Sequence, residues 1–201
     1  IENIKVRIEL LPILQSKFLV KDIELSNGVV KLLRNQYDSS WNFEKIAPPS
    51  ETVSQPSGTQ PIIDVRKLNF SNIKFQLKDS SVIETSGKFN PLDLYLNNLN
   101  INLSAYANLN SNKIRGNIRN ISFYENNNNF NLKALAIAFK MDSTSINVEK
   151  LSLQTDRSNI NIIANLKDFS PLSQEKYTNI EAAIFDVNAN IDSINTSDLL
   201  T

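Results

Sequence analysis

Oxygen-bearing side chains recur at every second position near the C-terminal end of the chain. Asp186, Asn188, Asn190 and Asp192 carry the carboxylate and amide oxygens that Ca²⁺ takes in loop sites. Such a loop needs glycine at its sixth position for a sharp turn, and Ile191 stands there instead. The residues between these oxygen donors are apolar, so the alternation predicts a β-strand and no metal site.

The chain contains no histidine and no cysteine. Histidine is the usual general base near neutral pH and the commonest metal ligand, so its absence removes both roles. Neither a Ser-His-Asp triad nor a Cys-His pair can be built, and no carboxylate pair stands out for acid–base work. We therefore predict that the chain is not an enzyme and has no catalytic residue, no metal ligand and no cofactor.

The charge balance argues against a nucleic-acid partner. Lys and Arg together number 21, as do Asp and Glu, so the net charge is zero, whereas nucleic-acid binders carry a basic excess. Hydrophobic residues make up 41% of the 201 residues, enough for one core or one long thin sheet. The alternating pattern is already present at Ile1 and continues towards Leu200, so we expect a segment of a longer protein.

Apolar and polar residues alternate along most of the chain, which predicts strands with one apolar face. Asn27-Gly28 lies between two apolar runs and predicts a hairpin turn. A slip of the pattern at Asn97-Asn98 predicts a bulge or a turn, and turns are expected at 126–129 and 155–158. The predicted strands cover 4–10, 20–25, 29–33, 65–72, 75–77, 92–96, 99–107, 118–124, 130–141, 146–153, 160–166 and 185–191.

Two segments depart from the strand pattern. Residues 41–46 predict one helical turn, capped by Ser39 or Ser40, with Trp41 or Phe43 closing an end of the sheet. Residues 47–61 are rich in Pro, Ser, Thr and Gln and predict a mobile linker. The chain therefore divides into a β region at 1–46, a polar linker at 47–61 and a second β region at 62–201 that continues the sheet.

A short motif recurs at 21–27, 66–72, 119–123 and 149–153. Each copy has a polar pair, an apolar residue, a small polar residue and another apolar residue. Similar units at loose spacing favour an array that grows by adding strands. Periodicity alone favours a two-sheet sandwich over a single curled sheet, because the pattern does not show what covers an apolar face.

Several of these segments resemble a known protein family. Residues 6–12, 20–25, 27–34 and 40–46, the last reading Ser-Trp-Asn-Phe-Glu-Lys-Ile, resemble the N-terminal region of AsmA-family proteins. Residues 98–104, 118–123 and 151–158 resemble TamB-like proteins of Bacteroidota. The resemblance implies an all-β fold: an elongated, curved antiparallel sheet, or β-taco half-pipe, with an apolar interior and a short helical turn near its N-terminal region.

The same resemblance implies a role in the bacterial envelope. We expect a periplasmic segment whose full-length protein is anchored in the inner membrane and could meet a BamA-like outer-membrane barrel. Its groove would shield phospholipid acyl chains during transport between the membranes and outer-membrane biogenesis. The alternative is a non-enzymatic structural or interaction β-domain, such as a sandwich or adhesin-like module, that assists outer-membrane protein assembly or secretion.

A groove for acyl chains needs inward apolar side chains without an interrupting charge, since each CH₂ removed from water contributes about 0.8 kcal/mol. The same residues would also serve as an ordinary core. The lining candidates are Ile23, Leu25, Leu68, Phe70, Leu99, Ile101, Leu103, Ile121, Phe123, Leu151, Leu153, Ile160, Ile162, Phe185, Val187 and Ile191.

Overall fold

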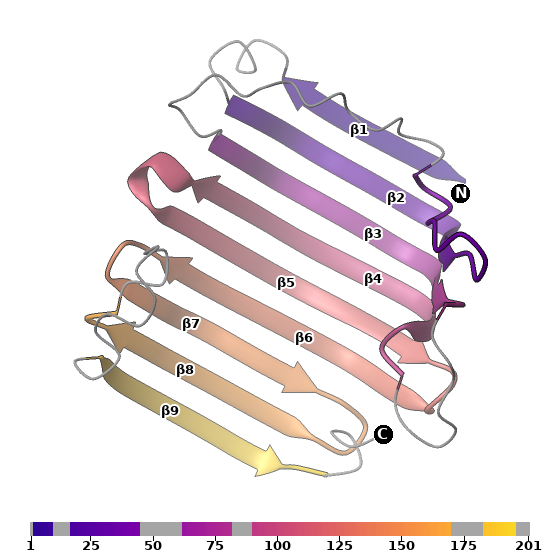
Figure 1. Cartoon of the computed structure of the whole chain (residues 1–201). Coiled ribbons are helices and arrows are strands. Elements are labelled where there is room, and N and C mark those ends of the chain that lie inside the picture. The colour runs from indigo at the N-terminus through magenta and orange to yellow at the C-terminus, as the bar shows by residue number, and fades with distance from the viewer. Residues whose placement is uncertain (1, 10–16, 45–61, 82–89, 170–182, 196–201) are drawn as a thin grey trace.

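The computed structural model describes residues 2–9, 17–44, 62–81, 90–169 and 183–195, and they form one nine-stranded sheet (Figure 1). The strands lie side by side in chain order, and the sheet is curved and unclosed, which confirms the all-β prediction. The strands are β1 (Asn3–Glu9), β2 (Lys17–Arg34), β3 (Ile62–Asp79), β4 (Asp93–Asn108), β5 (Lys113–Glu125), β6 (Phe130–Met141), β7 (Ser145–Gln154), β8 (Asn159–Lys167) and β9 (Ile184–Ser193).

The regions 1–46 and 62–201 contribute to the same sheet, because β2 pairs directly with β3. No second sheet is present among the described residues, so the sandwich that periodicity favoured is wrong for this part of the chain. The expected linker at 47–61 and the Leu-Pro break at 11–14 lie outside the described residues.

One strand pair differs from the expected antiparallel sheet. β2 and β3 run parallel, with Ile23 opposite Leu68 and Leu25 opposite Phe70, whereas all other neighbouring pairs are antiparallel. The first two copies of the repeated motif therefore lie next to each other in register. A parallel pair needs a long connection, and residues 35–61 separate these two strands in the sequence.

The hairpin predicted at Ser26-Asn27-Gly28 is wrong, because β2 continues through these residues to Arg34. Asn27 adopts the left-handed conformation (φ 50°), as asparagine does in turns, but here within a strand. Asn72 in β3 (φ 53°) and Asn98 in β4 (φ 50°) do the same. The Asn72 side-chain amide donates to the Asn27 side-chain oxygen at 2.9 Å, which links two of these irregular positions across strands.

Substitutions at Asn98 would test whether asparagine occupies these positions because it tolerates the left-handed backbone conformation. Replacing Asn98 with glycine is expected to leave the free energy of unfolding nearly unchanged, because glycine adopts positive φ without strain. Replacing it with valine should lower that free energy by about 1–2 kcal/mol, because a branched side chain is strained there. Urea denaturation measures both variants. Equal losses for glycine and valine would show that backbone strain does not govern this position.

The turns predicted at 126–129 and 155–158 are confirmed. The Glu125 carboxylate, 2% exposed, accepts hydrogen bonds from the backbone N–H groups of Asn127 and Asn128 at 3.0 and 2.8 Å. The Thr155 hydroxyl accepts a bond from the Ser158 N–H at 2.8 Å. Side-chain oxygens thus satisfy the backbone donors that each reversal would otherwise leave without partners.

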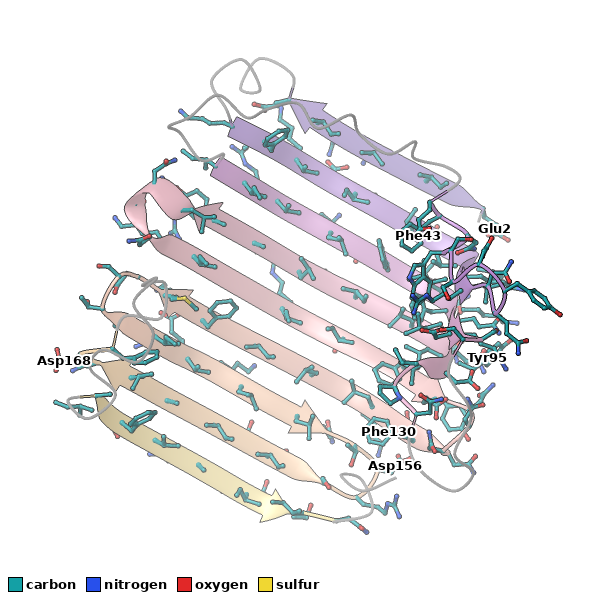
Figure 2. All side chains as sticks on the ribbon, in the orientation of Figure 1. Glu2, Phe43, Tyr95, Phe130, Asp156 and Asp168 are labelled. Atoms are coloured by element: carbon teal, nitrogen blue, oxygen red, sulfur yellow. The ribbon has the colours of Figure 1, made fainter. Side chains whose placement is uncertain are left out.

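The predicted helical turn at 41–46 is described up to Glu44, where Trp41 forms a bridge and residues 42–44 form a turn. The Trp41 N–H donates to the Glu44 carboxylate at 3.1 Å, and the Ser40 hydroxyl donates to the Asp38 carboxylate at 2.7 Å. Trp41 forms a bridge with Arg34 at the end of β2, and its ring stacks on Phe43 at 5.9 Å. Figure 2 shows Phe43 at that end of the sheet. The described 3-10 helix lies elsewhere, at Leu109–Ser111.

Full burial is confined to a small part of the sheet. Ile73 is completely buried, and it packs with Leu96 and Leu99 at 8% and 6% exposure. Side chains around this cluster, such as Phe70 and Phe75, are only partly buried. The described sheet therefore has a compact core near one end and leaves most of its apolar residues half-buried.

Candidate functional site

Cross-strand pairing arranges the apolar residues of successive strands in continuous rows. Residues that face each other in neighbouring strands point to the same side of a sheet, so a chain of such pairs defines a row. Two rows cross all nine strands without a polar residue, and we call them the central rows. One contains Ile4, Leu25, Phe70, Ile101, Ile121, Leu135, Leu153, Ile160 and Ile191, and the other Val6, Ile23, Leu68, Leu103, Ile118, Ile137, Leu151, Ile162 and Ala189.

Two further rows on the same side of the sheet lie next to the central row that contains Val6, and they widen this surface. They contain only apolar residues and Gly116, and none of their members is charged. One runs Ile8, Val20, Val65, Ala105, Gly116, Phe139, Val148, Ala164 and Val187, and the other Phe18, Ile63, Ala107, Ile114, Met141, Ile146, Leu166 and Phe185. With neighbouring strands about 4.8 Å apart, a nine-strand row is about 38 Å long. We call the four rows together the apolar face.

The strand register places all sixteen predicted lining residues on one side of the sheet. Twelve of them belong to the central rows; Val187 and Phe185 belong to the two further rows. Leu99 lies opposite Ile73, and Phe123 lies opposite Leu132 next to the central rows. Leu99 is buried, the three candidates in β9 are exposed, and the others are half-buried. The register does not separate a groove lining from a core, so their role remains a prediction.

The sequence analysis named no lining residue in β6, although Leu135, Ile137 and Phe139 lie on the apolar face. Ala134, Ala136 and Ala138 occupy the intervening positions of this strand. Because these alanines lie on the polar side of the sheet, β6 is apolar on both sides and its sequence does not alternate between apolar and polar residues. The signal that could have identified the row is the position of the large side chains alone, which recur at every second residue from Leu135 to Met141.

Charged groups lie where the apolar side of the sheet ends. Arg34 and Asp79 are opposite each other at the ends of β2 and β3, and their side chains form an ion pair at 3.0 Å. Hydrogen bonds from Ser81 and Arg34 hold the pKa of Asp79 below its ordinary value. Glu125 faces Leu96 at the same end. The charges thus mark a boundary beyond the four apolar rows.

The opposite side of the sheet carries an ion cluster over β1, β2 and β3. Arg7 pairs with Asp22, whose side chain is 4% exposed, and Lys67 pairs with Glu24 at 2.6 Å. Lys5 lies 3.7 Å from both carboxylates. The hydrogen bond from Arg7 lowers the pKa of Asp22, and the one from Lys67 lowers the pKa of Glu24. These pairs fasten edge strand β1 and strand β3 to β2 on the polar side.

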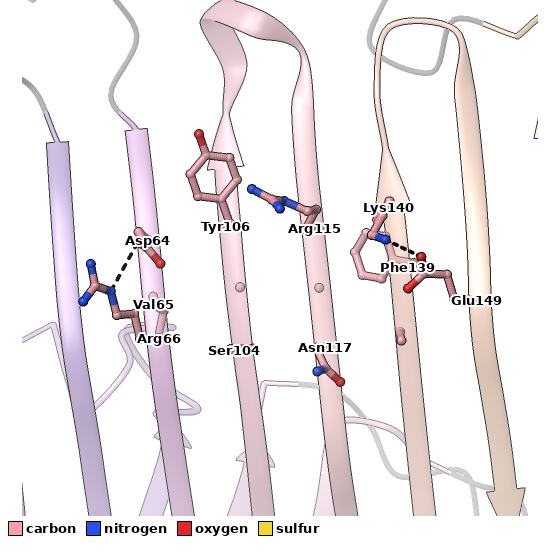
Figure 3. A pocket seen from close by; sticks show the side chains of 13 residues that line it. Asp64, Val65, Arg66, Ser104, Tyr106, Arg115, Asn117, Phe139, Lys140 and Glu149 are labelled. Atoms are coloured by element: carbon pink, nitrogen blue, oxygen red, sulfur yellow. Dashed lines mark hydrogen bonds and ion pairs between the residues drawn. The ribbon is translucent and has the colours of Figure 1, made fainter.

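An open hollow of about 400 Å³ lies on the polar side between β3 and β7 (Figure 3). Small side chains of Ser104, Asn117 and Ala138 lie opposite one another across three strands. Charged side chains surround them, but most are already engaged, as in the Asp64–Arg66 and Lys140–Glu149 ion pairs. Arg115 stacks over the Tyr106 ring, 4.8 Å from its centroid. The hollow holds no grouping typical of a catalytic site.

The alternating oxygen donors at 186–192 lie in strand β9, which confirms the strand prediction. The described residues contain no group of acidic side chains arranged to hold a metal ion. No helix in the described part of the chain has the length and apolar character to cross a membrane. The apolar face is therefore the feature of the described structure with the clearest binding capacity.

Neither a protein-family model, nor a curated protein, nor a solved structure matches this chain.

Proposed function

We propose that the apolar face shields the acyl chains of phospholipids, and that the chain is a periplasmic segment of an AsmA/TamB-like protein. The observation that carries this proposal is the pair of uninterrupted central rows. They offer apolar contact along about 38 Å with no charged side chain among their members. In the described part of the sheet, no second sheet covers them.

The physical chemistry of this surface suits a ligand that slides. Each CH₂ removed from water contributes about 0.8 kcal/mol, so many contacts along a row hold a chain while no single contact traps it. The rows also lack hydrogen-bonding groups that would fix a ligand in one position. In the full-length protein, such a surface would support lipid transport between the membranes, with a BamA-like barrel as a prospective outer-membrane partner.

Adjacent residues on opposite sides of β4 provide the test. A photo-reactive phenylalanine analogue at Ile101, in a central row, is expected to cross-link to phospholipid when the protein is made in bacterial cells and irradiated. The same analogue at Asn102, the next residue, should give little adduct, because Asn102 lies opposite Asn69 and Asn120 on the polar side. Mass spectrometry of the purified protein identifies the lipid adduct and its site.

A second pair of variants separates lipid binding from folding. Ile162→Asp places a charge in a central row and is expected to remove most co-purifying phospholipid, whereas Asn161→Asp on the other side should not. Circular dichroism checks that both variants are folded. Equal cross-linking at Ile101 and Asn102, or a lipid-free protein, would contradict the proposal and favour a structural or interaction module.

A further inference from the structure

Basic residues are concentrated in the strands of the sheet. The whole chain is neutral, with 21 basic and 21 acidic residues, but the nine strands hold 17 of the basic residues and only 10 of the acidic ones. Strands β5 to β8 carry seven basic residues and two acidic residues. One of these acids, Glu125, is 2% exposed and bonded to the turn that follows it, so Glu149 is the one exposed acid of these four strands.

Most of the basic residues on β5 to β8 have no carboxylate partner among the described residues. Lys133 pairs with Asp156 at 3.1 Å, and Lys140 pairs with Glu149. The five other basic residues form no such ion pair, and all of them are exposed. We call them the basic patch, and they are Lys113, Arg115, Arg119, Lys150 and Lys167.

The basic patch lies on the polar side of the sheet and extends in two directions. Lys113 and Arg115 alternate along β5 with residues of the apolar face, and Arg119 donates to the Asn102 side chain at 3.1 Å. Lys150 lies opposite Ala138 in β6. The patch extends about 20 Å along β5 and about 14 Å across the strands from β5 to β8. It therefore forms a broad charged area and not a single line of charge.

Like charges face each other within this area. Arg115 lies directly opposite Lys140 of β6, and like charges in facing positions destabilise a sheet. Arg115 stacks over the Tyr106 ring, which is neutral, so Glu149 supplies the one nearby negative charge, to Lys140 (Figure 3). An anionic partner over this area would offset the repulsion that the strand register creates.

The side chains between these cations are short. Asn117 lies opposite Ala138, and Ala136 lies opposite Ser152. The open hollow of about 400 Å³ lies over Ser104 and the first of these pairs. The cationic groups can therefore reach a broad charged surface before their neighbours do. A protein–protein interface has large apolar and aromatic residues at its centre, whereas short side chains occupy the centre of this area.

We propose that the basic patch binds the surface of a membrane that contains anionic phospholipids. Each Lys or Arg close to such a surface strengthens binding about fivefold. This attraction falls off within a Debye length, so it weakens as the salt concentration rises. Binding would place the polar side of β5 to β8 against the lipid headgroups and leave the apolar face free. The inference goes beyond the proposed shielding of acyl chains and does not depend on it.

Vesicle flotation of the purified protein provides the first measurement. Vesicles of phosphatidylcholine and phosphatidylglycerol in equal parts are expected to bind the protein at low salt and to release it at high salt. Vesicles of phosphatidylcholine alone should bind little of it. Contact through the apolar face does not require a charged headgroup and is not weakened by salt, so these comparisons distinguish the two sides of the sheet.

Matched lysine substitutions locate the binding surface. Lys113→Gln combined with Lys150→Gln should weaken binding to the anionic vesicles about 25-fold. Lys31→Gln combined with Lys74→Gln is the control, because it removes the same charge from exposed lysines of β2 and β3 outside the basic patch. The control should weaken binding by no more than about twofold, since charges beyond a Debye length contribute little. Circular dichroism checks that both double variants are folded.

Three results would overturn the proposal. The first is equal binding, or none, to the two kinds of vesicle. The second is an equal loss for the two double variants, which would mean that net charge and not the basic patch determines binding. The third is tighter binding to soluble polyglutamate than to anionic vesicles, which would assign the basic patch to an acidic protein partner.

Discussion

Replacing Ile73 with alanine is expected to lower the free energy of unfolding by about 3 kcal/mol, a typical loss for removing a large aliphatic side chain from a core. Ile73 is completely buried and lies at the centre of the described hydrophobic cluster, between Leu96 and Leu99. Truncation removes apolar contacts and leaves a cavity that the surrounding strands fill only partly. Urea denaturation followed by tryptophan fluorescence and circular dichroism measures the loss.

Ile163→Ala is the matched control for this experiment. Ile163 is 59% exposed and lies opposite Asn188 on the polar side of β8, so its truncation should change the free energy by no more than about 0.5 kcal/mol. Ile101→Ala, in a half-buried position, should fall between the two. Equal losses at Ile73 and Ile163 would show that the cluster around Ile73 is not the main core of this sheet.

The strands themselves could be predicted from the sequence because alternation is a local property. Apart from Leu92, which lies in the turn before β4, every predicted strand residue that the structure describes lies in a strand of the sheet. The slip at Asn97-Asn98 is a bulge in β4 with Asn98 in the left-handed conformation. The apolar side of each strand follows from the same pattern, which explains why all sixteen lining candidates lie on one side of the sheet.

Strand connectivity could not be predicted in the same way. Asn27-Gly28 has the composition of a hairpin turn, and Asn27 does adopt the left-handed conformation that such a turn needs. The chain nevertheless continues as one strand, because β2 pairs with the same neighbour, β3, both before this point and after it, from Gly28 to Arg34. Pairing between residues 45 positions apart, such as Ile23 and Leu68, outweighs a local turn preference.

The same alternation is found for residues that are completely buried and for residues that are only half-buried. Ile73 and Ile101 each lie on the apolar side of a strand, yet Ile73 is completely buried and Ile101 is half-buried. The difference depends on how side chains from several strands pack above each position. The sequence could therefore predict which residues face the apolar side, whereas the size of the compact core required the structure.

Gly116 is the position where the apolar face should be most sensitive to an added side chain. A Cβ atom at Gly116 would lie 2.2 Å from a ring carbon of Phe139, the residue opposite it in β6. Gly116→Val is therefore expected to lower the free energy of unfolding by about 2 kcal/mol, because the ring must leave its place. In a Phe139→Ala background the same substitution should cost almost nothing, since the space is empty and valine favours strands.

A double-mutant cycle built from Gly116→Val, Phe139→Ala and their combination measures the coupling between these two residues. The expected interaction energy is about 2 kcal/mol, within the range for residues in direct contact. A similar cost of valine in both backgrounds would assign the glycine to a backbone requirement, such as a close strand approach. Strong coupling would mean that the Phe139 ring fills the place that β5 leaves without a side chain, which keeps this row of the apolar face continuous across a glycine.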